Sequence, residues 1–319
     1  MPSLVTLVDG TVPVASDFNG NYTALNNAIG SATAISAWVV GEIPYASATN
    51  TLARLTPGSA GQVLTMGASI PAWSAAAGLT DQLTGLGLAN NGADATNDID
   101  IAVGAAASAD AAIANRVFMS LTSALTKQLD VNWVVGTNQG GLDTGAIGNN
   151  TYHVHLIQRV DTGVVDVLFS LSATAPTMPT NYTKSRRIGS IVRVSAAIKA
   201  FKQDGDWFDW VDPVLDVNNG ATGTGANTAT LTLPVGIVVI ARINLQTNDT
   251  LYWSPLDVTD SAPSASIAPL ATTGDDVAGT VFGNMHIRTN TSAQVRYRAL
   301  ANSTARAATT GWIDRRSKG

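Results

Sequence analysis

The stretch HVHLIQRVDTGVVDVLF, residues 153–169, contains two short runs rich in β-branched and aromatic residues, at 153–157 and 164–169. Runs of this length and composition are typical of β-strands. From about residue 127 onward similar runs recur with turn residues between them, at 133–135, 191–194, 200–202, 207–210, 230–233, 236–245, 286–288, 294–298 and 311–314. Their spacing is typical of a sandwich or jelly roll. We therefore predict a mainly β protein in which residues 127–319 form an antiparallel, jelly-roll-like β-sandwich head.

The composition excludes several classes of protein. The chain has 319 residues, among them 48 Ala and 37 Thr but no Cys, so a disulfide scaffold and a cysteine metal site are excluded. Hydrophobic residues make up 45% and the net charge is only −5, which argues against charge-driven disorder. Charged residues make up 13%, about half of the roughly 25% usual in soluble domains. Surfaces of Thr, Asn, Ser and Gly are typical of extracellular β proteins and fibres.

Charge is distributed unevenly along the chain. Residues 1–115 carry one basic and eight acidic residues, whereas residues 116–319 carry 17 basic and 15 acidic residues. Neither part has the clustered positive charge of a nucleic-acid surface, so we expect no nucleic-acid partner. The longest apolar runs, such as 237–241, have the length of a strand, so we expect no membrane insertion. The first residues do not resemble a signal peptide, which predicts synthesis in a cytoplasm without an export address.

Residues 1–36 are predicted to contain a short helix from about residue 17 to Gly30. An acidic or hydroxyl residue can cap its start, and the glycine can end it. Its narrow apolar stripe consists of Phe18, Tyr22, Leu25 and Ile29. A stripe this thin suits a seam between identical copies, as in a short coiled coil. The alternative is that the helix packs on strands of its own chain.

Residues 37–126 are predicted to form an extended stalk. Short hydrophobic pairs alternate there with Gly, Ser, Thr and Pro, so one chain buries too little apolar surface to fold alone. We expect the stalk to wrap against partner chains through Ile43, Tyr45, Leu52, Leu55, Leu64 and Trp73. Further along, DIDIAV (98–103) alternates polar and apolar residues, which predicts a strand.

Four short motifs follow one another in the stalk: GEIPYAS (41–47), NTLARL (50–55), GSAGQVLT (58–65) and PAW (71–73). In this order they resemble a module found in bacteriophage tail fibres and related tail proteins. The resemblance implies a homotrimeric shaft whose N-terminal end attaches to the virion. The single copy implies a short fibre.

Two other regions resemble the same family. DFNGNYTALNNAI (17–29) is similar to the helix that opens many such fibres. TYHVHLI (151–157), the segment 165–191 and FKQDGDWFDW (201–210) resemble their globular C-terminal domain. Within 165–191 the matching residues are Asp166, Phe169, Pro176, Pro179, Tyr182, Arg186, Arg187, Ile188 and Gly189.

His153 and His155 are the candidate metal ligands. On a strand they point to one face and could bind a metal, and some trimeric fibres hold an axial iron between such pairs. Here the pair lies in a strand of the head rather than in a narrow shaft, which favours ordinary strand packing. We therefore expect no metal and no cofactor.

An acidic cluster, Asp204, Asp206, Asp209 and Asp212, is the candidate for chemistry. Paired carboxylates beside aromatic residues could cleave a sugar. The alternative is an exposed hairpin with its turn at 204–205, whose strand sends at least one of its aromatic residues into the core. We favour the hairpin and expect neither catalytic residues nor enzyme activity.

A candidate receptor contact lies at Tyr252 and Trp253, shortly after Asn248 and Asp249. Sugar rings stack on Trp and Tyr, while Asn and Asp supply hydrogen bonds. The alternative is a tryptophan in the core or between subunits.

Together these features predict a non-enzymatic tail fibre of the virion. The N-terminus would attach to other phage tail or baseplate proteins, and the head would bind a bacterial surface glycan or protein. The first alternative is an architectural baseplate, collar or capsid-spike component that does not contact the receptor. A glycan depolymerase is the remaining alternative.

Overall fold

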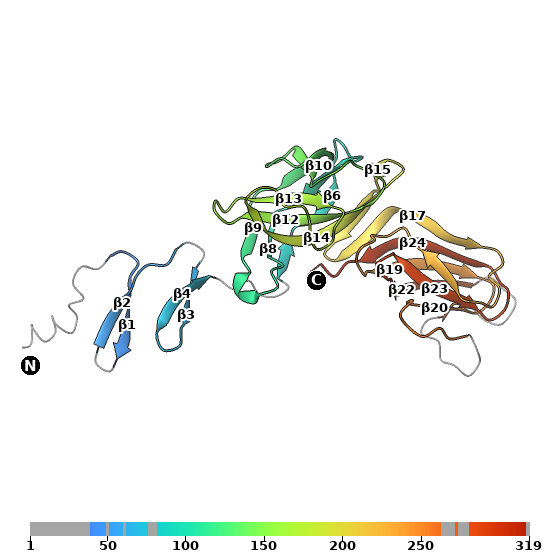
Figure 1. Cartoon of the computed structure of the whole chain (residues 1–319). Coiled ribbons are helices and arrows are strands. Elements are labelled where there is room, and N and C mark those ends of the chain that lie inside the picture. Colours follow the sequence, from blue (N-terminus) through green and yellow to red (C-terminus); the bar gives the residue numbers. More distant parts are fainter. Residues whose placement is uncertain are drawn as a thin grey trace, which may run out of the picture. The chain divides into compact units, whose positions relative to one another are not determined.

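The computed structural model describes residues 39–48, 51–59, 62–75, 82–262, 272–273 and 281–316. The predicted helix and its seam residues Phe18, Tyr22, Leu25 and Ile29 lie outside these residues. The chain divides into two compact units, Met1–Ala76 and Ala77–Gly319. Strands dominate the described residues of both units in Figure 1, which confirms the prediction of a mainly β protein.

The described part of the first unit, which we call the hairpin unit, consists of two antiparallel hairpins. Their strands are β1 (Ile43–Ala48), β2 (Thr51–Leu55), β3 (Gln62–Met66) and β4 (Pro71–Ala75). The pairing β1–β2 joins the first two sequence motifs, and β3–β4 joins the last two. Each predicted motif is therefore one strand, or most of one strand, of a hairpin.

The second unit begins with a first lobe of two sheets. The larger sheet has the order β15 (Ala197–Ile198), β14 (Tyr182–Val194), β12 (Thr151–Arg159), β13 (Val165–Ser170), β11 (Gln139–Leu142), β10 (Leu125–Asn132), β7 (Asp98–Ile101) and β6 (Leu88–Asn90). The smaller sheet is β5 (Leu83–Gly85), β8 (Gly104–Ala107) and β9 (Phe118–Leu121). A 3-10 turn, η1 (Ile113–Asn115), lies between β8 and β9.

The second lobe also consists of two sheets. One has the order β16 (Phe201–Asp204), β17 (Trp207–Asn219), β24 (Ala305–Ile313), β19 (Ile240–Thr247) and β22 (Val281–Arg288). The other is β18 (Asn227–Thr230), β23 (Gln294–Ala299), β20 (Leu251–Ser254) and β21 (Thr272–Thr273). All its described strand pairs are antiparallel.

The stretch 153–169 forms two strands, as its sequence predicts, and they are neighbours within the larger sheet. Strands β12 and β13 pair antiparallel, from His153 with Ser170 to Gln158 with Val165. Strand β14 covers the other edge of β12. Because β12 has neighbours on both edges and cover on both faces, its first seven residues are all buried.

Two expectations about the head are corrected. The compact unit begins at Ala77 rather than at residue 127, because Leu86, Leu88 and Ile99 are buried in its core. The predicted strand at 98–103 is β7 together with the turn after it, and it belongs to the first lobe. The pairing is also not purely antiparallel, since β11 runs parallel to both β10 and β13.

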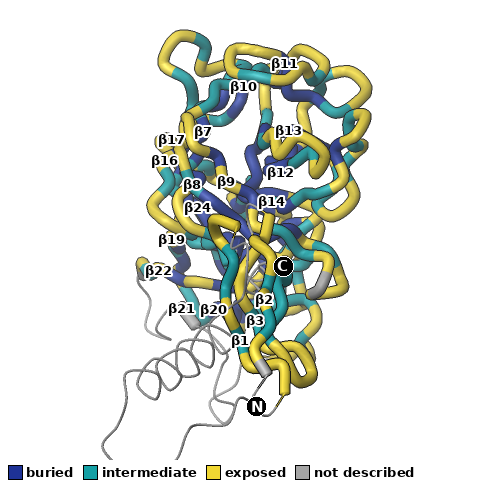
Figure 2. Tube along the Cα trace, turned by 90° about the vertical axis from the view of Figure 1, so that its left-hand side faces the viewer, coloured by how far each residue is buried: buried dark blue, intermediate teal, exposed yellow. Residues whose placement is uncertain are grey.

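The larger of two hydrophobic core clusters among the described residues extends through both lobes, and the smaller one consists of Ile157, Leu168 and Tyr182. Figure 2 shows buried residues along their central strands, whereas β1, β2 and β3 are mainly exposed or intermediate. In the second lobe Trp312 stacks on Phe208 with ring centroids 4.7 Å apart. Ring stacking of this kind joins β24 to β17 inside the core.

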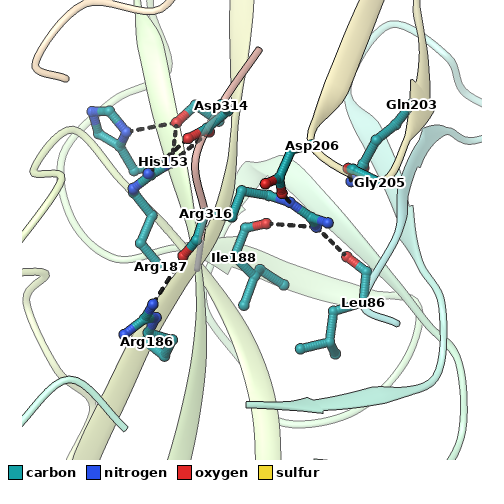
Figure 3. Close-up of polar contacts among 11 residues, drawn as sticks. Leu86, His153, Arg186, Arg187, Ile188, Gln203, Gly205, Asp206, Asp314 and Arg316 are labelled. Atoms are coloured by element: carbon teal, nitrogen blue, oxygen red, sulfur yellow. Dashed lines mark hydrogen bonds and ion pairs between the residues drawn. The ribbon is translucent and has the colours of Figure 1, made fainter. Parts of the chain in front are cut away.

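The C-terminal segment 314–316 ties the two lobes together, as Figure 3 shows. The Arg187 guanidinium, on β14, donates two hydrogen bonds to the Asp314 carboxylate at 2.6 and 2.8 Å. Arg316 Nη1 donates to the carbonyls of Ile188 and Leu86 at 3.1 and 3.4 Å. Because Asp314 and Arg316 follow β24 of the second lobe, these bonds cross from one lobe to the other.

Candidate functional site

The sequence motifs of the hairpin unit contact one another. Arg54 Nη1 donates to Glu42 Oε2 at 3.1 Å, across the β1–β2 pair. Trp73 Nε1 donates to the Thr56 carbonyl at 2.7 Å. The indole also covers Gly58, where an added Cβ would lie 2.6 Å from the ring. The motif residues therefore hold each hairpin and the connection between the hairpins in place.

Apolar side chains of the hairpin unit face outward. Between residues 39 and 75 none of the described hydrophobic side chains is buried. Seven large ones are at least two-fifths exposed: Val39, Val40, Leu52, Val63, Leu64, Met66 and Ile70. The other predicted stalk-packing residues, Ile43, Tyr45, Leu55 and Trp73, are half-buried. Two-stranded hairpins are marginal in water without a covering partner, so this unit has an apolar surface to cover.

The predicted receptor contact is not assembled on the surface. Trp253 is 1% exposed and packs on Tyr297 with ring centroids 5.0 Å apart, and Tyr252 is also buried. The side chains of Asn248 and Asp249 accept hydrogen bonds from backbone N–H groups of the β23–β24 connection, at 2.7 and 2.9 Å. A buried indole offers no face to a sugar ring. The structure thus favours the alternative of a core tryptophan.

A different hollow, on the first lobe, has the composition of a sugar site. Its volume is about 690 Å³, within the range of about 300–1,000 Å³ usual for small-ligand sites. Trp133, Tyr182 and Met178 provide its aromatic and apolar lining, and the Trp133 and Tyr182 rings meet edge to face at 5.0 Å. Four threonines also line it: Thr144, Thr162, Thr177 and Thr180. We call this hollow the Trp133 groove.

The surrounding structure fixes the Trp133 groove in its shape. Trp133 Nε1 donates to the Val167 carbonyl at 3.0 Å, and Lys127 Nζ lies 5.4 Å from the indole centroid. The Asp143 carboxylate accepts a hydrogen bond from the Thr177 N–H at 2.9 Å, which holds the β13–β14 connection at the rim. A site that is already ordered loses less entropy when a ligand binds.

A buried ion pair lies next to Trp133. Lys127 Nζ is 3.2 Å from Asp166 Oδ1, and the two side chains are 0% and 1% exposed. The ammonium also donates to the carbonyls of Val134 and Gly136 at 2.7 and 3.1 Å, while the Gly136 N–H donates to Asp166 Oδ2 at 2.7 Å. Burial lowers the pKa of Lys127, and the Asp166 charge opposes that shift. The pair fixes the loop that carries Val134 and Gly136.

The two strand histidines are buried within the first lobe. His153 Nδ1 lies 2.9 Å from Ser190 Oγ, and His155 Nε2 donates to the Ser172 carbonyl at 2.9 Å. Burial lowers the pKa of His153 to about 3 and that of His155 to about 4. Across the residues that the structure describes, no group of three His, Cys, Asp or Glu side chains could hold a metal ion.

The acidic cluster is spread over a hairpin. Strands β16 and β17 pair antiparallel around a turn at Gly205, as expected. Asp206 pairs with Arg316 at 3.1 Å, and Asp209 pairs with Arg242. At least one aromatic residue of β17 enters the core, as predicted: Phe208 and Trp210 are buried, whereas Trp207 is 43% exposed.

Comparisons with known proteins leave the family open. No known family matches the chain, and no curated protein resembles it in sequence. Within the described residues, no helix is long and apolar enough to cross a membrane.

No sequence pattern directly indicates the Trp133 groove. Trp133 lies in a predicted strand, and Tyr182 lies in the motif 165–191, but nothing in their spacing shows that their rings meet. Asp143 comes from a third segment. A tryptophan close to the ends of predicted strands is the one signal that could have suggested this groove.

Proposed function

We propose that this chain is a structural protein of a bacteriophage tail, a short homotrimeric fibre within the virion. Its N-terminal end attaches to other tail or baseplate proteins, and its second unit, with its sandwich-like second lobe, binds a bacterial surface glycan through the Trp133 groove. The observation that carries the proposal is the exposed apolar surface of the hairpin unit. Three copies bury this surface against one another, and three weak sites on one fibre raise avidity.

The trimer is tested by mass. Light scattering of the full chain is expected to give three times the monomer mass of 32.8 kDa. The double change Leu52→Asp and Leu64→Asp places charges on the surface to be buried, and we expect it to reduce the mass to that of the monomer. The control Leu300→Asp alters an exposed leucine of the second unit and should leave the trimer intact. A wild-type monomer would contradict the proposal.

The glycan site is tested on an array of bacterial surface polysaccharides. Trp133→Ala removes one of the two aromatic rings that line the groove, and Thr162→Arg fills the groove from an exposed position. Loss of a stacking tryptophan costs on the order of 1–3 kcal/mol, so we expect binding at least about fivefold weaker. The control Thr228→Arg, at an exposed position of β18, should bind as the wild type does.

The alternatives give different results. Equal binding by wild type and Thr162→Arg would remove the Trp133 groove from the proposal. A trimer that binds no polysaccharide and no intact bacterium would favour the architectural component. Release of reducing sugar from a bound polysaccharide would favour a depolymerase.

A further inference from the structure

A second cavity lies where the two lobes meet. It has a volume of about 530 Å³, and we call it the junction cavity. Its lining comes from both lobes: His155 on β12 and 185–187 on β14, together with 236–238, Thr291 and the C-terminal segment 314–316. It is separate from the Trp133 groove, since the two share no lining residue.

The lining of the junction cavity is strongly basic. Four arginines line it, Arg186, Arg187, Arg315 and Arg316, against one carboxylate, Asp314. These five side chains carry a formal charge of +3, from four positive charges and one negative. An arginine fork matches the geometry of a carboxylate or phosphate, so a cavity of this kind suits an anionic ligand.

Most of this charge is held in fixed positions. Arg187 forms a fork with Asp314, and Arg316 is held by two carbonyls and by Asp206 (Figure 3). Arg186 Nη2 donates to the Arg316 carbonyl at 2.9 Å. Arg315 differs, because it is exposed and makes no hydrogen bond or ion pair with the described part of the chain. Its guanidinium can therefore turn to meet a ligand.

His155 adds a second chemical requirement. Its Nε2 donates to the Ser172 carbonyl, so in the neutral ring Nδ1 is an acceptor. Burial and the nearby Arg187 keep the ring neutral by lowering its pKa to about 4, and a backbone hydrogen bond to Ser172 only partly opposes this. Nδ1 has no hydrogen-bond partner in the described structure. A simple anion without a hydrogen cannot satisfy this nitrogen, whereas a hydroxyl group can.

We propose that the junction cavity binds a carboxylate-bearing sugar unit. Its carboxylate pairs with Arg315 beside Arg187, and its hydroxyl groups bond with His155 and with the hydroxyl side chains at the rim, among them Thr174 and Ser185. The biological role of this sugar, as part of the host glycan, rests on the proposed function. The binding itself does not depend on the Trp133 groove.

The test is calorimetric titration of the full chain with tri-galacturonate, with neutral tri-galactose as the matched ligand. We expect measurable binding of the acidic sugar, and binding at least tenfold weaker for the neutral one. Arg315→Ala should weaken acidic-sugar binding about tenfold, as expected for a lost charged hydrogen bond, and Arg315→Lys less so. Val238→Trp, at a half-exposed lining position, should fill the cavity and abolish binding without changing charge.

Two controls separate this proposal from its alternatives. Lys202→Ala removes an exposed positive charge outside the cavity and should leave the affinity unchanged. Thr162→Arg blocks the Trp133 groove and should also leave it unchanged, so failure of the proposed receptor groove remains distinguishable. The proposal would be overturned if the protein bound the neutral sugar or sodium sulfate as tightly as the acidic sugar. It would also be overturned if Val238→Trp bound the acidic sugar as tightly as the wild type does.

Discussion

Replacing Asp166 with alanine is expected to lower the free energy of unfolding by about 3–5 kcal/mol, because it leaves the Lys127 ammonium buried without its counter-charge. The lysine is 0% exposed, and of its three oxygen partners only the carbonyls of Val134 and Gly136 would remain. Gly136 would also lose the acceptor of its N–H. Urea unfolding of the full chain, at one fixed protein concentration, measures the change.

An exposed ion pair serves as the matched control. Arg159 and Asp161 form a pair at 2.7 Å in which both side chains are substantially exposed. Asp161→Ala should therefore cost much less stability than Asp166→Ala. The double change Lys127→Met and Asp166→Leu removes both charges, and we expect it to be more stable than Asp166→Ala alone. If Asp166→Ala cost no more than Asp161→Ala, the buried pair would not have the role assigned to it.

The strands could be predicted because their signal is local. The runs predicted as strands at 153–157 and 164–169 lie in β12 and β13, and the run at 207–210 forms the start of β17. Period and composition are properties of a few neighbouring residues, so a single sequence suffices to read them.

The extent of the head could not be predicted, because it depends on contacts between residues that are far apart in the sequence. Strands β6 and β7 belong to it because β7 pairs with β10 and because the backbone N–H of Leu88 donates to Gln203, 115 positions away. The parallel pairs of β11 with β10 and β13 are likewise non-local. Composition alone placed residues 77–126 with the Ala- and Gly-rich stalk.

The binding sites were the least predictable part. Trp253 follows polar residues that suggested a surface loop, yet residues 251–253 are all buried. Trp133, just after β10, and Tyr182, at the start of β14, meet although β11, β13 and β12 separate these two strands in the sheet. The neighbours of Arg315 in the junction cavity come from six other segments of the chain. Sites made from distant segments depend on the fold, which local patterns do not determine.

The second large effect expected is loss of stability in mild acid, caused by His153 and His155. Burial lowers the pKa of both rings, to about 3 and about 4, from the ordinary value of 6.5. The unfolded chain therefore binds these protons at a higher pH than the folded chain does. The free energy of unfolding is therefore undiminished by the histidines above about pH 6.5, and it falls as the pH drops towards the pKa values of the folded chain. Each ring contributes about 1.4 kcal/mol per pH unit within this window.

Between pH 7 and pH 4.5 the two histidines should together lower the free energy of unfolding by about 5 kcal/mol. Asp98 opposes them, since its pKa is raised to about 6 by burial and by neighbouring carboxylates. Urea unfolding of the wild type is compared with that of the double variant His153→Asn and His155→Gln. The difference gives the contribution of the two histidines to the pH dependence of the unfolding free energy. The amides keep hydrogen-bonding groups near Ser190 and Ser172 but do not titrate, so the variant should lose less stability between pH 7 and pH 4.5. The control His286→Gln, at an exposed position, should keep the wild-type change of unfolding free energy with pH. If the double variant also kept this change, the loss of stability in acid would belong to other groups.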